Sequence, residues 1–553
     1  MELTPNLLND VQLSDAQSPI GSDSDIRGFY NHLVYILRLH PDVHQILNKV
    51  ESGEPTNDLM PGEIYQATST LFHENLHWWQ FVGSTSGLIM SLSLPAQITS
   101  NLKFFKDYLA LSGKKKPITT YSDNCHRPDD TDDPEFRAIN QILNTFHDIH
   151  FYKVRTKRPK KITECYKSKY FESVGHSFNI TYASSLGLIA TTFDPDYSFL
   201  PNPAAWQDEF RRLADEKVSG FYYGEKSIGI PPIGTADLYE GQARFNQMLY
   251  LHTVSNKTLD WFQFRQVGML HGLYESAFTL FLKILEEECP KSVDSPLVAL
   301  YLLLIDIAIN PAEGFPFDIV EYEEFVNATD PGIRFVYLCN AVKHEYPEFK
   351  GLITEYSSEE YWVISTVLCE AIGVIPPIIY LEKFSSWCDN EESIIKLMED
   401  NEKFNFEPGN LLVRLILARF LSFQQDKLKN PEFFCWPGIY LEGERRNTTT
   451  DHFYLKHQAL FKENLNMDIA PSMLPGIAEK TLEDTAGEFY LAVVLFELCQ
   501  QWILEPGDFE YNFQWLSKYY SSEDLESWAK NAFITTFGVS PDDFEIVTPK
   551  ASS

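Results

Sequence analysis

The sequence has little from which to build a cysteine-based site. Its eight cysteines are scattered and form no Cys-x-x-Cys pair, so a cysteine zinc site has no support. Such thin spacing in a 553-residue chain is typical of reduced, buried thiols in a cytosolic protein. The N-terminus, MELTPNLLNDVQLSD, has no basic region followed by an apolar one. We therefore expect no signal peptide and a cytoplasmic location.

Long apolar runs without charge or proline are also lacking. The segment that most resembles a membrane span, residues 361–381, contains Glu370 in its middle and Pro376 and Pro377 near its end. A carboxyl group in lipid is costly, and two prolines break a helix. We expect a buried helix there and no membrane partner.

Positive charge is in short supply. The chain has 45 Lys and Arg against 78 Asp and Glu, a formal net charge of −33. This excess argues against general binding to nucleic acid or anionic membranes, because most of the surface would repel phosphate. The exception is the basic strip, residues 153–169 (KVRTKRPKKITECYKSK), with eight Lys or Arg. It predicts either a solvated insertion or a docking site for an acidic partner or a nucleic-acid trigger.

Strand signals are few, and helical periodicity dominates. The best strand candidates are residues 178–185 (FNITYASS) and 227–233 (SIGIPPI). We therefore predict a mainly α protein, of the α+β kind with a minor sheet. Apolar residues recur at three- and four-residue spacing in segments 27–50, 61–82, 96–111, 135–151, 235–253, 260–288, 295–310, 360–381, 408–428, 485–504 and 522–536.

Proline-marked changes of composition near residues 290 and 430 suggest three parts. Residues 1–290 are expected to form a large catalytic region, with helical additions at 291–430 and 431–553.

The stretch LFHENLHWWQ, residues 71–80, carries the pattern of a metal site. It lies in a predicted helix, residues 61–82, on which positions i and i+4 share a face. His73 and His77 can therefore direct their imidazoles at one point, as neutral ligands of Zn²⁺. Glu74 would flank the metal and suits a base that takes a proton from water.

His-Glu-x-x-His is the zincin signature, and the sequence resembles the zinc metallopeptidases called zincins. The longer form HExxHxxGxxH is absent, because Gln80 and Gly83 stand where glycine and histidine would be needed. Two other interpretations remain open: a pair of core histidines, and a di-iron bundle that uses Glu74-x-x-His77. The second needs another Glu-x-x-His motif, and the sequence has none.

Zinc needs a third protein ligand, and Glu240 in GTADLYEGQARFNQ is the best candidate. It lies on a predicted helix, residues 235–253. Gly241 and Ala243 offer a patch of small residues that could press against the histidine helix. This pairing resembles the gluzincin branch of the zincins, which implies a large helical zincin-like catalytic domain with a His₂Glu zinc site.

Other carboxylates compete for this role, and other residues could support it. The competing ligands are Glu275, Glu313 and Glu370, and Glu240 could instead pair with Arg244 as a solvated carboxylate. Many gluzincins carry an acid where this chain has Arg244, so Asp237 is the candidate to orient a zinc histidine. Gln80 could contact substrate, hold a ligand, or be an ordinary surface amide.

A peptidase also needs a donor for the oxyanion that develops on the carbonyl. His271 and Tyr274 are the first candidates, because they follow Glu240 on a predicted helix. The other candidates are Tyr239, Tyr222 and Tyr223.

The sequence therefore predicts a zinc-dependent metallopeptidase that cleaves a protein or peptide. We expect a regulated intracellular protease, such as a bacterial toxin or defence effector. The alternatives are a catalytically silent, zincin-like interaction protein and a zinc hydrolase of a non-peptide bond.

Overall fold

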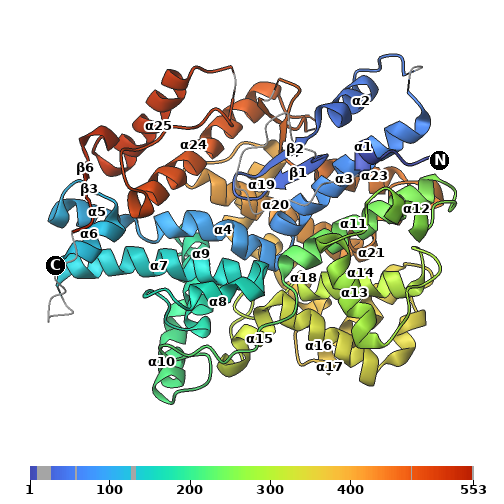
Figure 1. The fold of residues 1–553 in the computed structure, drawn as a ribbon, viewed down its shortest axis with the longest axis horizontal. Helices are drawn as coiled ribbons and strands as arrows, with labels where there is room; N and C mark the ends of the chain where they lie inside the picture. Colours follow the sequence, from blue (N-terminus) through green and yellow to red (C-terminus); the bar gives the residue numbers. More distant parts are fainter. Residues whose placement is uncertain are drawn as a thin grey trace.

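The computed structural model describes residues 1–8, 26–56, 59–125, 133–466, 468–474, 476–517 and 519–550. Helices make up 65% of the structure and strands 4%. This confirms the prediction of a mainly α protein with a minor sheet (Figure 1).

Helices extend along the whole described chain. The longer helices are α2 (Pro41–Glu51), α3 (Pro61–Gly83), α4 (Thr85–Thr99), α5 (Leu102–Ser112), α7 (Pro134–Lys157), α9 (Val174–Phe193), α10 (Gln207–Asp215), α11 (Thr235–Val254), α13 (Leu273–Leu285), α14 (Pro296–Ala308), α16 (Pro331–His344), α17 (Ser358–Ala371), α18 (Pro377–Asn390), α19 (Glu392–Lys403), α20 (Leu411–Lys429), α23 (Thr448–Lys456), α24 (Glu479–Leu504) and α25 (Ser522–Phe537). The shorter helices are α1 (Pro5–Leu8), α6 (Ile118–Asn124), α8 (Ile162–Cys165), α12 (Trp261–Gln266), α15 (Phe325–Thr329), α21 (Pro431–Cys435) and α22 (Pro437–Tyr440).

The sheet is built from segments that the sequence did not indicate as strands, and β1 and β2 lie in segment 27–50, for which a helix was predicted. Its order is β1-β2-β4-β5, with β1 antiparallel to β2, β2 parallel to β4, and β4 antiparallel to β5. The strands are β1 (Gly28–Asn31), β2 (Ile36–Leu39), β4 (Phe461–Glu463) and β5 (Ile469–Pro471), and a second pair joins β3 (Lys115–Lys116) to β6 (Glu545–Ile546).

Both strand predictions were wrong. Residues 178–185 lie inside α9, and residues 227–233 contain no strand. The Ser173 side chain caps α9 by accepting from the His176 N–H at 3.1 Å, and burial of Phe178 and Tyr182 stabilises the helix. This tertiary packing outweighs the weak preference of Ile180 and Thr181 for strands.

Helices α3 and α11 lie side by side in the middle of the molecule (Figure 1). The first of the two predicted helices, residues 61–82, is confirmed to within one residue. From Phe72 to Gly83 every side chain of α3 is buried. Gly241 does not press against α3 as expected: a Cβ there would come within 2.3 Å of the Tyr301 hydroxyl of α14.

The hydrophobic core joins distant parts of the chain. One large cluster contains buried residues from each of the three predicted regions, from Leu7 to Val493. A second cluster packs α24 and α25 against α5 and α7, at the left of Figure 1. The division near residues 290 and 430 stays a prediction.

The basic strip is not the solvated insertion that was one of its two interpretations. Its first residues complete α7, and the chain continues through a 3₁₀ turn, Pro159–Lys161, into α8. Arg155 is buried, lies 3.3 Å from the Asp330 carboxylate, and donates to the Gly229 carbonyl at 2.6 Å. The strip is therefore anchored in the fold.

No helix within the described ranges combines the length and the apolar character needed to cross a membrane. The segment 361–381 is divided between α17 and α18, and the second helix begins at Pro377.

A buried ion pair ties α14 to α20. The Lys427 ammonium lies 2.6 Å from the Asp306 carboxylate, which also accepts from the Tyr361 hydroxyl at 2.8 Å. Lys427→Met would leave this carboxylate buried without its cation. We expect it to lower the free energy of unfolding by about 3–5 kcal/mol, measured by urea denaturation.

Lys403→Met is the control for this variant, because the Lys403–Glu399 pair is exposed and 3.9 Å apart. Its effect should stay below about 0.5 kcal/mol. Equal effects of the two substitutions would contradict a structural role for the buried pair.

Candidate metal centre

Helix α3 is well defined at both ends, which fixes the direction of its side chains. Pro61 occupies the first turn, where its missing N–H costs nothing, and the Glu63 carboxylate accepts from the Met60 N–H at 2.9 Å. The helix ends at Gly83, and the Ser84 side chain caps α4 by accepting from the Gly87 N–H at 3.0 Å. His73 and His77 therefore lie one turn apart on a rigid rod.

Three donor atoms converge where α3 meets α11. The Nε2 atoms of His73 and His77 are 3.2 Å apart, and they lie 3.5 and 3.3 Å from Oε2 of Glu240. Ligands about 2.05 Å from a tetrahedral zinc ion would be roughly 3.3 Å from one another. The triangle therefore has the size of one face of a zinc coordination shell.

The polar atoms of this triangle lack other partners. Within the described residues, Glu240 Oε2 is buried and receives no well-aligned hydrogen bond, although both imidazoles are near. Three electronegative atoms this close repel one another unless a cation or a shared proton lies between them. The donor set, two imidazoles and a carboxylate, is one that zinc prefers.

The charges of the site are set by burial and by mutual contact. Burial lowers the pKa of His73 to about 4, so its imidazole is neutral, as a ligand must be. Burial also opposes the charged form of His77, but the nearby Glu240 carboxylate outweighs this and raises the pKa of His77 to about 9. Burial alone would raise the pKa of Glu240, yet His77 and His73 hold it well below its usual range.

Gln80 orients one of the histidines. It is buried, and its Oε1 accepts from His77 Nδ1–H at 2.7 Å, which turns Nε2 of His77 toward the triangle, where a metal ion would displace its proton. The Gln80 amide donates in turn to the Tyr239 carbonyl at 2.9 Å and to Gln242 Oε1 at 3.0 Å. The prediction of a supporting role fits this geometry, and an exposed amide is excluded.

Asp237 has a different role from the one expected. Its carboxylate accepts from the Gly234 N–H at 3.1 Å and from the Ser276 hydroxyl. It therefore closes the start of α11 and ties it to α13. Among the described residues no hydrogen bond joins Asp237 to His73 or His77.

Glu74 is buried against the first strand of the sheet. A Cβ added to Gly28 of β1 would lie 2.6 Å from Glu74 Oε1, so only glycine leaves room for this carboxylate. Nothing in the sequence indicated that Gly28 belongs to the site, because the two residues are 46 positions apart and on different elements.

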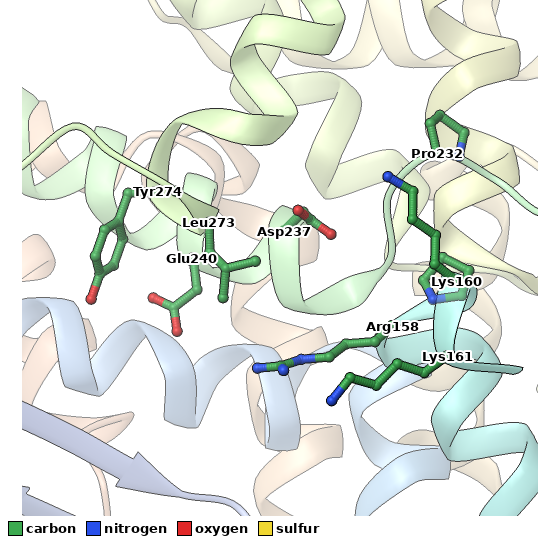
Figure 2. A pocket seen from close by; sticks show the side chains of 10 residues that line it. Arg158, Lys160, Lys161, Pro232, Asp237, Glu240, Leu273 and Tyr274 are labelled. Atoms are coloured by element: carbon green, nitrogen blue, oxygen red, sulfur yellow. The ribbon is translucent and has the colours of Figure 1, made fainter. Parts of the chain in front are cut away.

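Tyr274 packs beside His73, whereas His271 packs against Tyr274. The Tyr274 and His73 rings are 6.0 Å apart, and the guanidinium of Arg244 lies 4.0 Å from the Tyr274 ring centre. Figure 2 shows the Tyr274 hydroxyl and the Glu240 carboxylate on the same side of the cleft. The predicted helix 260–288 is divided, so His271 falls between α12 and α13 and contacts Tyr274 with rings 5.4 Å apart.

The competing residues lie elsewhere. Glu275 pairs with Arg265, Glu370 is exposed on α17, and Glu313 forms a bridge to residue 317. Tyr239 is buried, with its hydroxyl 3.4 Å from Ser84 Oγ, and Tyr223 is exposed. The Tyr222 side chain bonds to Glu225. Only His73, His77 and Glu240 form a group of potential ligands in the part of the chain that the structure describes.

A cleft of about 440 Å³ opens beside the triangle (Figure 2). Glu240 and Tyr274 line one side of it, and the 3₁₀ turn of the basic strip lines another. The Glu240 side chain keeps 22% of its surface exposed, against 3% for His73. A ligand in the cleft can therefore approach the triangle from the Glu240 side.

Comparison with known proteins adds no assignment: no protein-family model, curated protein or solved structure matches this chain.

The triangle predicts one zinc ion per chain. His73→Ala and Glu240→Ala each remove one of three ligands, so we expect each to lower zinc affinity roughly 100-fold or more. Elemental analysis after dialysis against a weak chelator measures the loss. Glu275→Ala, on α13, is the control and should retain zinc. Loss of zinc in the control but not in Glu240→Ala would contradict this ligand set.

Gln80→Leu tests the orienting hydrogen bond. It keeps the volume but removes the acceptor for His77 Nδ1–H, so zinc affinity should fall about 10- to 100-fold, measured by competition with a fluorescent chelator. Gln66→Leu is the matched control, because Gln66 is also buried on α3 but bonds to the N-terminal segment. If both variants bind zinc like the wild type, Gln80 has no orienting role.

Proposed function

We propose that the protein is a zinc-dependent metallopeptidase. The observation that carries this proposal is the triangle of His73, His77 and Glu240, with sides of 3.2–3.5 Å. The buried Glu74 carboxyl group is close enough to raise the pKa of His77, and a cleft opens on the Glu240 side.

The residues of the site have two proposed roles: some would hold the metal ion, and others would take part in peptide hydrolysis. The triangle would hold zinc, and Gln80 would keep the His77 ring in the correct tautomer. A zinc ion bound there would supply Lewis acidity, which acidifies water and polarises a carbonyl group. Glu74 takes a proton from the attacking water and passes it to the leaving amine. The Tyr274 hydroxyl donates to the oxyanion.

Two features favour catalysis over a purely structural metal. Structural zinc sites are closed by four protein ligands, whereas the described residues supply three and leave one side toward the cleft. A structural site also has no need of a second buried carboxyl group, yet β1 is shaped by Gly28 to accommodate Glu74.

We further propose an intracellular enzyme with few substrates. All eight cysteines are free thiols, and six are buried, which is typical of a reducing compartment. A regulated protease, such as a bacterial toxin or defence effector, fits a reducing compartment and a candidate metal site that lies beside a cleft.

Glu74→Gln separates catalysis from metal binding. It should retain zinc and lower the rate of peptide cleavage about 10²- to 10⁴-fold, because the general base is lost while the ligands remain. Mass spectrometry of a peptide library digested by the zinc-loaded protein measures the rate.

Glu63→Gln, on the same helix, is the control and should cleave like the wild type. Zinc binding without cleavage of any peptide by the wild type would favour a silent metal-binding protein or a hydrolase of another bond.

A further inference from the structure

The cleft beside the triangle has a basic wall. Arg158, Lys160 and Lys161 line it opposite Glu240 and Tyr274. Figure 2 shows that Arg158 and Lys161 extend toward the side that holds Glu240, whereas Lys160 turns away. In a chain with a net charge of −33, this is an unusual concentration of positive charge at the entrance to a site.

The wall is fixed in place by contacts on both sides. Arg155 anchors the end of α7 through its ion pair with Asp330 and its hydrogen bond to Gly229. The first residue of α11, Thr235, donates through Oγ1 to the Thr156 carbonyl at 3.4 Å. Helix α11, which carries Glu240, therefore contacts the end of α7, which leads into Arg158, so the fold sets the position of the cations relative to Glu240.

Helix α7 carries two more lysines before the wall, outside the lining of the cleft. Lys153 and Lys157 are one turn apart on α7, an arrangement in which like charges repel. Burial, together with Lys157, lowers the pKa of Lys153 to about 7. Burial, together with both lysines, also lowers the pKa of His32. The His32 ring stacks on Phe81 of α3, with ring centres 4.5 Å apart.

We propose that the cleft binds the acidic side chain of a peptide, and that Arg158 and Lys161 select a Glu or Asp close to the scissile bond. This inference rests on the proposed peptidase function. A guanidinium binds a carboxylate through two parallel hydrogen bonds, and the partly buried position of both cations reduces screening by salt. A polyanion such as nucleic acid is the less suitable occupant, because the acidic remainder of the surface repels it.

Peptide binding to the zinc-loaded Glu74→Gln protein tests the selection without relying on turnover. Two fluorescent pools of random decapeptides, differing only in a central Glu or Gln, are compared by fluorescence anisotropy. We expect the Glu pool to bind about tenfold more tightly, as one charge-assisted contact provides. Adding Arg158→Gln and Lys161→Gln together should reduce this preference to less than about twofold.

Lys167→Gln is the matched control, because Lys167 belongs to the same basic strip but is exposed and does not line the cleft. It should keep the full preference. Zinc content and thermal unfolding of each variant show that the fold is retained.

Three outcomes distinguish this inference from the proposed function. Equal binding of the two pools, or an unchanged preference in the double variant, overturns the acidic selection. Displacement of the Glu pool by a single-stranded oligonucleotide at lower concentration than by unlabelled Glu peptide also overturns it. A Glu preference in a protein that cleaves no peptide supports the acidic site and contradicts the peptidase.

Discussion

The contact between α3 and α11 is the constraint on which the rest of the structure depends. It places three electronegative atoms within 3.5 Å of one another in a largely buried position. Such an arrangement needs a positive charge between the atoms, which a proton on His77 or a metal ion can supply in a medium of low dielectric constant. The fold keeps the helices together through buried side chains, including Gln80, which bonds to both elements. A metal ion bound there would take the place of the proton on His77.

Packing around the triangle explains how a polar site can be held so firmly. The second half of α3 is buried on all sides, with Trp78, Trp79 and Phe81 against neighbouring helices and the first strand. Aromatic side chains of this size fix a helix in rotation as well as in position. The absence of a side chain at Gly28 then gives Glu74 a defined place beside the histidines.

The basic wall of the cleft is opposite in sign to the net charge of the chain. The chain is strongly acidic, yet the cleft has basic side chains along one wall. Because fields in a cleft are screened less than fields over an exposed surface, a few cations there outweigh many distant carboxylates for a ligand that enters it. The acidic surface repels polyanions, whereas the proposed acidic peptide would meet the basic wall inside the cleft.

The local part of the site could be predicted from the sequence, because it depends on helical spacing alone. His73, Glu74 and His77 share a helix whose start and end are marked by Pro61 and Gly83. Glu240 was one of several carboxylates that could complete the set, and only tertiary structure brought it to the histidines while leaving Glu275 and Glu370 elsewhere.

Contacts between distant segments could not be predicted from patterns in the sequence. The parallel pairing of β2 with β4 joins residues about 425 positions apart, and strands this short carry almost no periodic signal. For the same reason neither the place of Gly28 beside Glu74 nor the basic strip as a wall of the cleft could be predicted from the sequence, whereas Gln80, one helical turn from His77, was a candidate. The sequence by itself determined which helix can hold a metal, since that follows from a repeat of 3.6 residues. Tertiary structure alone decided what closes the site and what lines its entrance, because those depend on side chains that meet only after the chain has folded.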